Sequence, residues 1–215
     1  LQLSFIHDWN SQAKREQLEY NMKYFPDNAH QGGNVSMQLA LSAPSDNWHQ
    51  IEFGYMKMIM NAKSSIYMHS PYFIPDKGYI NALRIAAKSG VDVRLIIPNK
   101  PDHIFVYWAT ITSVAQLIRD GVKVYTYENG FIHSKMMIID DEVASVGSSN
   151  MDIRSFELNF EVNAFMYDEQ ITKQLKAAFL EDLKVSKELT EERYNQRSNW
   201  IKFKQSIAKL ASPIL

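Results

Sequence analysis

The sequence predicts an α/β domain in which helices cover both faces of a mixed β-sheet. Short runs rich in β-branched and aromatic residues alternate with longer amphipathic segments along most of the 215 residues. Gly90 and Gly121 follow two of the expected helices, at the position where a left-handed residue commonly ends a helix. One expected strand pair in the second half of the chain gathers polar side chains, and the functional prediction depends on that pair.

The first 34 residues have the weakest pattern. Residues 3–9 fit a short strand or the end of one, and residues 11–24 fit a helix with Ser11 as its N-cap. Pro26 would end that helix, because the residue before a proline disfavours the helical conformation. We expect residues 1–34 to be a connector and residues 35–215 to form the folded domain.

Strands and helices alternate from residue 35 to residue 127. We expect strands at 35–43, 65–69, 91–97 and 122–127, and helices at 48–62, 78–88 and 103–120. The helices are predicted from apolar residues at helical spacing, such as Ile80, Leu83 and Ala87. Loops at strand ends carry binding sites in open α/β sheets. Tyr72 and Phe73, in the loop after the second strand, therefore either line a substrate entrance or have a structural role.

A β-hairpin is expected between residues 132 and 146. Residues 132–139 are apolar and rich in isoleucine, and side chains alternate across a strand, so His133 and Lys135 share a face. If Asp141-Glu142 forms the turn, residues 143–146 return as an antiparallel partner. His133 then pairs with Asn150, and Lys135 pairs with Ser148. A turn with a three-residue loop would break this pairing.

This pairing would bring an imidazole, an ammonium, a hydroxyl and a carboxamide together. The charge of Lys135 and the donors of Ser148 and Asn150 suit a phosphoryl group. His133 can then act as nucleophile or as general acid and base. The alternative is a structural hairpin in which neighbours satisfy a buried histidine.

Two carboxylates lie close to this group in the sequence. Asp140 has the opposite strand parity to His133, so it should point away and bond either backbone groups or a basic side chain. Glu161 begins another expected strand, at residues 161–167, and is the candidate for orienting the His133 ring.

Three helices are expected after residue 170, at 171–183, 189–196 and 199–210. The last is amphipathic and basic, and such a helix either packs on its own domain or lies on anionic lipid.

Composition excludes several kinds of function. The chain has no cysteine, so it has no disulfide, thiol nucleophile or thiolate metal site, and no acidic cluster suggests a bound metal. A formal net charge of −1 argues against a constitutive nucleic-acid partner. No apolar run approaches the roughly 20 residues that span a bilayer, and no signal peptide is present. Because the first residue is Leu, we expect the chain to be a fragment of a longer protein.

The polar residues form motifs that resemble a known family. His133, Lys135 and Asp140 form H-x-K-x4-D, and G-S-x-N follows at 147–150, which resembles the phospholipase D superfamily signature. The run N-x-D-x-R-S-F-x-L-N-x-E at 150–161 is similar to one in bacterial cardiolipin synthases. So are S-P-Y-F-I-P-D at 70–76, G-V-D-V-R at 90–94 and L-A-S-P-I-L at 210–215. The resemblance covers nearly the whole chain, and it implies a phospholipase D-like α/β/α sandwich from the C-terminal half of such an enzyme.

The resemblance implies phosphatidyl transfer between two phosphatidylglycerol molecules, giving cardiolipin and glycerol through a phosphohistidine. His133, Lys135 and Asp140 would be catalytic motif residues, with Asp140 in a supporting role. Lys135, Ser148 and Asn150 would hold the phosphate, and neither a cofactor nor a metal is implied. The C-terminal histidine of two-motif relatives usually serves as acid and base, which assigns that role to His133.

This chain contains a single H-x-K. The second histidine would come from an absent N-terminal half, to which residues 1–34 would connect, or from a second copy of the chain through a two-fold interface. The parent protein is expected at the cell membrane with this domain on the cytoplasmic side, and the fragment itself is expected to be soluble. Anionic phospholipids and the membrane surface would be its partners.

Two rival functions use the same residues. A phosphodiesterase acting on nucleic acid shares the H-x-K-x4-D motif, but it predicts a basic groove that the balanced charge does not suggest. The other rival is a catalytically inert lipid-binding half-domain.

Overall fold

The structure of the protein is a computed structural model that describes residues 1–25, 33–100, 102–198, 200–201 and 204. Its contacts divide the chain into two units, Leu1–Asn34 and Val35–Leu215. The division falls where the sequence analysis places the start of the folded domain. The role of residues 1–34 as a connector stays a prediction.

The predictions of a strand at residues 3–9 and of a helix at residues 11–24 are wrong, and Pro26 lies outside the described residues. Residues Gln2–Gln12 form helix α1, and Met22–Tyr24 form a single 3₁₀ turn. Phe5 and Trp9 are four residues apart, and their rings lie 6.0 Å apart on one helix face, which is helical rather than strand spacing. The segment after α1 is held by Asn10, whose amide nitrogen donates to Leu18 O at 2.8 Å and whose amide oxygen accepts from Leu18 N at 2.7 Å. These bonds satisfy the backbone of Leu18 without a helix.

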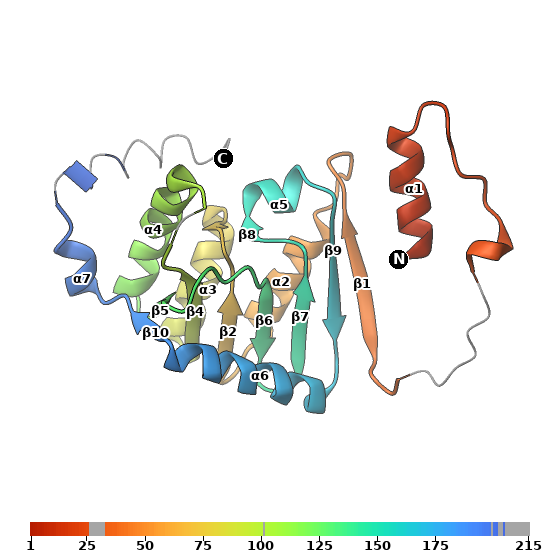
Figure 1. Ribbon diagram of the computed structural model, residues 1–215. Coiled ribbons are helices and arrows are strands. Elements are labelled where there is room, and N and C mark those ends of the chain that lie inside the picture. The colour runs from red at the N-terminus through yellow and green to blue at the C-terminus, as the bar shows by residue number, and fades with distance from the viewer. Residues whose placement is uncertain (26–32, 101, 199, 202–203, 205–215) are drawn as a thin grey trace. The chain divides into compact units, whose positions relative to one another are not determined.

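The second unit is built on a mixed sheet of eight strands within the described residues, in the order β1-β9-β7-β6-β2-β4-β5-β10 (Figure 1). The bounds are β1 Met37–Ser42, β2 Ser65–His69, β4 Asp92–Pro98, β5 Lys123–Tyr127, β6 Met136–Ile139, β7 Val143–Gly147, β9 Glu161–Met166 and β10 Ser186–Glu188. Strands β2, β4 and β5 are parallel, and the other neighbours pair antiparallel. A second sheet pairs β3 (Phe73–Ile74) with β8 (Met151–Asp152).

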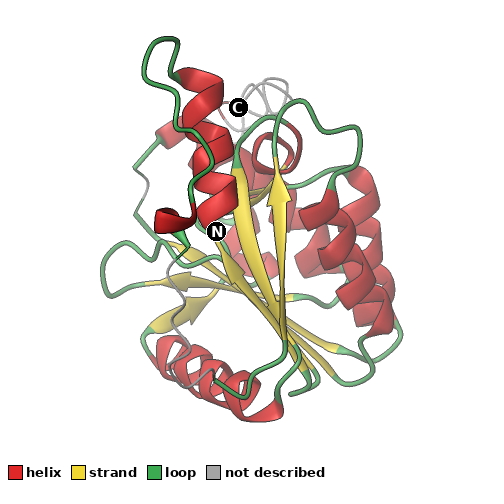
Figure 2. Cartoon of the chain, turned by 90° about the vertical axis from the view of Figure 1, so that its right-hand side faces the viewer, coloured by secondary structure: helices red, strands yellow, loops and turns green. Residues whose placement is uncertain are grey.

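Helices cover both faces of the sheet, as the sequence predicts (Figure 2). The bounds are α2 Gln50–Asn61, α3 Lys77–Lys88, α4 Ile104–Arg119, α5 Ile153–Glu157, α6 Glu169–Lys184 and α7 Glu191–Asn195. Residues of α2, α3, α4 and α5 share one hydrophobic cluster with the sheet, and α6 packs in a separate cluster against other sheet residues. The fold class is therefore α/β with a mixed sheet between two helical layers.

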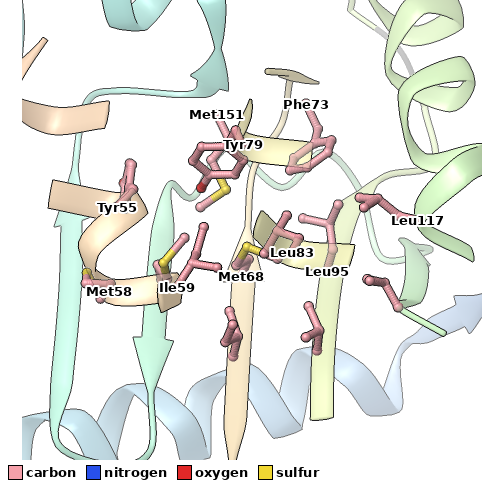
Figure 3. Packing of buried hydrophobic residues seen from close by; sticks show 14 of the residues in the cluster. Tyr55, Met58, Ile59, Met68, Phe73, Tyr79, Leu83, Leu95, Leu117 and Met151 are labelled. Carbon is pink, nitrogen blue, oxygen red and sulfur yellow. The ribbon is translucent and has the colours of Figure 1, made fainter. Parts of the chain in front are cut away.

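The larger cluster forms the main core. Tyr55 and Met58 of α2, Leu83 of α3 and Met68 of β2 are among its members, and their side chains fill the layer between helices and sheet (Figure 3). Phe73 is fully buried in this cluster. The prediction that Phe73 lines a substrate entrance is therefore wrong, because β3 turns its side chain into the core.

The central strands and helices of the second unit lie within a few residues of their predicted bounds. Four short elements were not predicted, namely β3, β8, α5 and β10. Each is five residues or shorter, too short to establish a periodicity. The helix predicted for 199–210 lies almost wholly outside the described residues. Among the described helices, none combines the length and apolar character that crossing a bilayer requires.

Phe179 attaches α6 to its face of the sheet. It is fully buried, and its ring stacks on Tyr67 and His69 of β2 with both centroid distances at 5.0 Å. We expect Phe179→Ala to lower the free energy of unfolding by about 3–5 kcal/mol, through lost burial and the cavity left behind. Leu180→Ala is the control, since Leu180 is partly exposed on the same helix. Urea unfolding measures both, and equal losses would contradict the anchoring role of Phe179.

Candidate active site

The hairpin of β6 and β7 has a different register from the predicted one. Met136 pairs with Val146 and Ile139 pairs with Val143, a shift of one residue, and the loop between the strands has three residues. Asp140 and Asp141 in this loop have φ values of 52° and 60°. Aspartate tolerates this left-handed conformation better than most residues. The predicted pairs His133–Asn150 and Lys135–Ser148 are therefore wrong, and Gly147 N donates instead to Lys135 O at 3.3 Å.

The first of these loop residues, Asp140, joins the hairpin to the start of β2. Its carboxylate accepts hydrogen bonds from the backbone N–H groups of Lys63, Ser64 and Ser65 at 2.6–2.8 Å, and from Ser64 Oγ at 2.9 Å. Burial raises the pKa of this carboxyl, but the three backbone donors lower it more, so the net shift is downward. Asp140 thus bonds backbone groups, as predicted, but strand parity is not the reason, because Asp140 lies in the loop after β6.

At the other end of β7, Gly147 lies against β9. A Cβ at this position would lie 2.3 Å from Asn163 Oδ1 and from Val162 O, so any side chain would push the strands apart. Asn163 is fully buried; its amide nitrogen donates to Tyr55 Oη at 2.7 Å, and its oxygen accepts from Ser149 N at 3.2 Å. Asn163 therefore holds the G-S-S-N turn in place. Sequence reasoning missed this residue, and the available signal was an amide at an inward position of β9.

Ser148 and Glu161 are brought together beyond the end of β7. Ser148 Oγ donates to the Glu161 carboxylate, and the same oxygen accepts from Val162 N at 2.9 Å. The second carboxylate oxygen of Glu161 accepts from Asn159 Nδ2 at 3.1 Å. Glu161 makes no hydrogen bond to His133 among the described residues. Its predicted role in orienting His133 stays a prediction without a direct contact to support it.

Lys135 is the buried cation of the site, with only 8% of its surface exposed. Its Nζ donates to His133 O at 2.9 Å. Burial lowers the pKa of Lys135, while the charges of Glu161, Asp152 and Asp102 oppose that shift. The ammonium group has further donors, and a phosphate oxygen is a suitable acceptor for them.

His133 precedes β6 rather than lying in it, because the strand begins at Met136. Its side chain is exposed and stacks on the Phe131 ring at a centroid distance of 5.6 Å. The described residues provide no hydrogen-bond partner for the imidazole. The alternative of a buried histidine satisfied by its neighbours is therefore wrong, since this ring is open to an incoming group.

Asn150 and Asp152 complete the site from β8 and the turn before it. Figure 1 shows β8 and α5 beyond the end of the sheet where β6 begins and β7 ends. Asp152 is nearly buried, and it caps α5 by accepting from Ser155 N at 2.6 Å. Burial raises the pKa of Asp152, and the charge of Glu161 adds to the increase. The amide oxygen of Asn150 is buried and has no hydrogen-bond partner among the described residues.

The site thus gathers one exposed imidazole, one buried ammonium group and several neutral donors at one end of the sheet. Within the described part of the chain, no three His, Asp or Glu side chains are placed to hold a metal ion. A family of proteins described as "Cardiolipin synthase, PLD-like domain" matches residues 55–183, which include the hairpin and the surrounding α/β elements. The chain belongs to this family.

Curated relatives agree with the PLD-like assignment along the whole chain. Cardiolipin synthase 1 of Staphylococcus aureus (strain MRSA252) is 63% identical over all 215 residues, and cardiolipin synthase 1 of Staphylococcus epidermidis is 61% identical over the same length. The chain spans 44% of the length of each of these relatives. It therefore corresponds to less than half of a protein of that kind.

Solved structures share the PLD-like fold. A phospholipase D family member, Nuc from Salmonella typhimurium, has a TM-score of 0.63 and 21% identity, over 73% of this chain and 99% of that one. Phosphatidylserine synthase from Haemophilus influenzae has a TM-score of 0.65 and 14% identity, over 84% of this chain and 46% of that one. These likenesses establish the fold.

We expect Asp140→Asn to act mainly on stability. The amide keeps one acceptor oxygen and loses the charge that three backbone donors stabilise, which should cost about 1–3 kcal/mol in the free energy of unfolding. The pKa of Asp140 is lower in the folded than in the unfolded state. The stabilisation by its charge is therefore complete when the pH is above the unfolded-state pKa. It is lost as the pH falls through the folded-state pKa. Urea unfolding at pH 7 and in acid should therefore show that the difference in unfolding free energy between wild type and Asp140→Asn becomes smaller in acid.

The control for Asp140→Asn is Asp141→Asn in the same loop. Asp141 makes a partly exposed ion pair with Lys176 at 2.7 Å, which should contribute less than about 1 kcal/mol. An Asp140→Asn protein of unchanged melting temperature that has lost turnover would refute the structural role.

Proposed function

We propose that this chain forms one half of the active site of a phosphatidyltransferase that converts two phosphatidylglycerol molecules into cardiolipin and glycerol. The observation that carries the proposal is the exposed His133 beside the buried Lys135, in a chain 63% identical along its full length to a cardiolipin synthase. The exposed imidazole is suited to nucleophilic or acid–base catalysis, and the buried ammonium group is suited to phosphate binding.

The proposed reaction has two steps that share one phosphorus atom. A histidine nitrogen attacks the phosphorus of the first lipid, the bond from phosphorus to the glycerol oxygen breaks, and a second histidine gives a proton to the leaving oxygen. A hydroxyl of the second lipid then returns a proton to that second histidine while its oxygen bonds to phosphorus, and the phosphorus–nitrogen bond breaks. We assign the proton-transferring role to His133.

Lys135, Ser148 and Asn150 would bind the nonbridging oxygens of the phosphoryl group. An ammonium group at short range stabilises the charge that develops in the transition state, and low exposure strengthens that interaction. Ser148 already donates to Glu161, so it would contribute to phosphate binding by exchanging this partner. Asp140 would support the site through the position of the hairpin.

The second histidine is proposed to come from another half of a longer polypeptide. The relatives are more than twice as long as this chain, and this chain contributes a single H-x-K motif. A second copy of this chain is the other source that the motif count allows. Anionic phospholipids at a membrane surface would be the partners of the whole protein, which would itself be associated with the cell membrane.

A comparison of two proteins tests the proposal. One is this chain alone, and the other is the longer polypeptide that contains it, extended to the length of the relatives and called here the full-length protein. Both are incubated with phosphatidylglycerol vesicles, and cardiolipin and glycerol are measured. We expect product from the full-length protein. A rate that grows with the square of the concentration of the short chain would indicate a homodimer, and absence of lipid product from both would refute the proposal.

His133→Ala in the full-length protein should reduce turnover by about 10²–10⁴-fold, the range usual for loss of a general acid or base. The melting temperature should stay close to that of wild type, because the side chain is exposed and unbonded. His7→Ala is the matched control, since His7 is also exposed and lacks a lysine two residues later. Wild-type turnover by a well-folded His133→Ala protein would remove His133 from the mechanism.

A further inference from the structure

A cavity of about 680 Å³ lies next to the phosphate-binding residues. The loop after β2, the start of α4 and the segment from β8 to α5 form its walls, and Tyr72, Asp102 and Asn150 are among the lining residues. Asn150 belongs to the G-S-x-N motif. A group bound in this cavity would therefore adjoin a phosphate bound by Asn150.

Two polar features of the cavity matter here. One is the hydrogen-bonded pair of Tyr72 and Asp102, and the other is the amide oxygen of Asn150. Tyr72 Oη donates to one oxygen of Asp102, and the other oxygen accepts from His103 N at 2.7 Å. Burial and the hydrogen bond to Asp102 raise the pKa of Tyr72, which keeps the phenol protonated. The buried amide oxygen of Asn150 lacks a partner among the described residues. The cavity thus offers hydrogen-bond acceptors and has room for a group that donates.

The charged side chains that line the cavity are Asp102, Asp152 and Arg154, so both acceptors and a cationic donor are present. The charges of Asp102 and Asp152 also raise the pKa of Lys135. Burial raises the pKa of Asp102, but the bonds from Tyr72 and from the backbone lower it more, so this carboxylate is ionised at neutral pH. An ionised carboxylate repels a phosphate and accepts from hydroxyl groups. A neutral polyhydroxyl group fits this lining, because each hydroxyl can donate to Asp102 or accept from Arg154.

One side of the cavity is apolar. Ile104 and Phe105, at the start of α4, line it and are about half exposed, at 51% and 54%. Such side chains suit the carbon skeleton of a small polyol or the first carbons of a lipid. A glycerol group has both parts, because its hydroxyls can face Asp102 while its carbons contact the apolar side.

We propose that this cavity is the subsite for the glycerol head group, in which Asp102 binds its free hydroxyls. The proposal rests on the proposed phosphatidyl transfer and specifies what selects the alcohol. The shared chemistry is a 1,2-diol, which both free glycerol and the head group of phosphatidylglycerol carry. Asp102 accepts from the diol, and Tyr72 holds the carboxylate in position.

The test measures the choice of acceptor by the full-length protein. Phosphatidylglycerol vesicles are the donor, and labelled glycerol and ethanol compete as acceptors, while hydrolysis to phosphatidic acid and formation of cardiolipin are followed in the same reaction. We expect Asp102→Asn and Tyr72→Phe to lower the ratio of glycerol transfer to ethanol transfer by about tenfold, as for loss of a hydrogen bond to a charged group. The ratio isolates the acceptor step, because glycerol and ethanol compete for the same phosphohistidine. Cardiolipin formation should fall with glycerol transfer if both sources of the diol use the cavity.

Tyr67→Phe is the matched control. Tyr67 Oη also donates to an aspartate, Asp92, at 3.1 Å, and neither residue lines the cavity. This variant should leave the acceptor ratio unchanged. Melting temperatures of all three variants check that the fold is intact.

One result overturns the subsite, and it differs from failure of the proposed function. An unchanged ratio of glycerol to ethanol transfer, whether or not both transfers fall, would show that Asp102 and Tyr72 do not select the diol. If the wild-type full-length protein forms no lipid product, the proposed function fails and the subsite fails with it.

Discussion

Burial of the Lys135 ammonium is the constraint on which the site depends. An ammonium group removed from water is costly unless charges and hydrogen bonds replace its hydration. The chain supplies Glu161, Asp152 and Asp102 from three separate segments, and each carboxylate has its own donor, namely Ser148, the backbone of Ser155, or Tyr72. Substitution of the lysine would leave these carboxylates without the cation that offsets their mutual repulsion. The charge of Lys135 therefore stabilises the loops that carry them.

The spacing of the H-x-K-x4-D motif has a simple structural cause. Strand β6 consists of the four buried residues between Lys135 and Asp140, so the two charged residues mark its opposite ends. At one end the cation faces the site, and at the other the carboxylate bonds the backbone at the start of β2. Since β6 pairs with both β2 and β7, fixing both of its ends fixes the centre of the sheet. The motif therefore combines the proposed phosphate-binding residue with a structural one, at a spacing set by the length of β6.

The sequence predicts the parts of this fold in which local pattern and packing agree. Helices such as α3 and strands such as β2 were found because their periodicity is set by burial on one or two faces. The register of the central hairpin was not found, because it depends on two consecutive left-handed residues, Asp140 and Asp141. Propensity does not reveal that conformation; the tertiary bonds of the Asp140 carboxylate to the start of β2 stabilise it. The predicted pairs of polar side chains depended on the hairpin register, so an error of one residue in the register gave the wrong pairs. Ser148 consequently contacts Glu161 rather than Lys135.

The charge balance around Lys135 also bears on the need for a second half. A single buried ammonium group is already surrounded by carboxylates, and a phosphodiester would bring one more negative charge to it. A further cation near the phosphate would therefore strengthen binding. The exposed side chain of His133 leaves room for an acid–base partner from another segment. The charge balance and the single H-x-K motif both agree with the proposed second half, which would supply the second histidine.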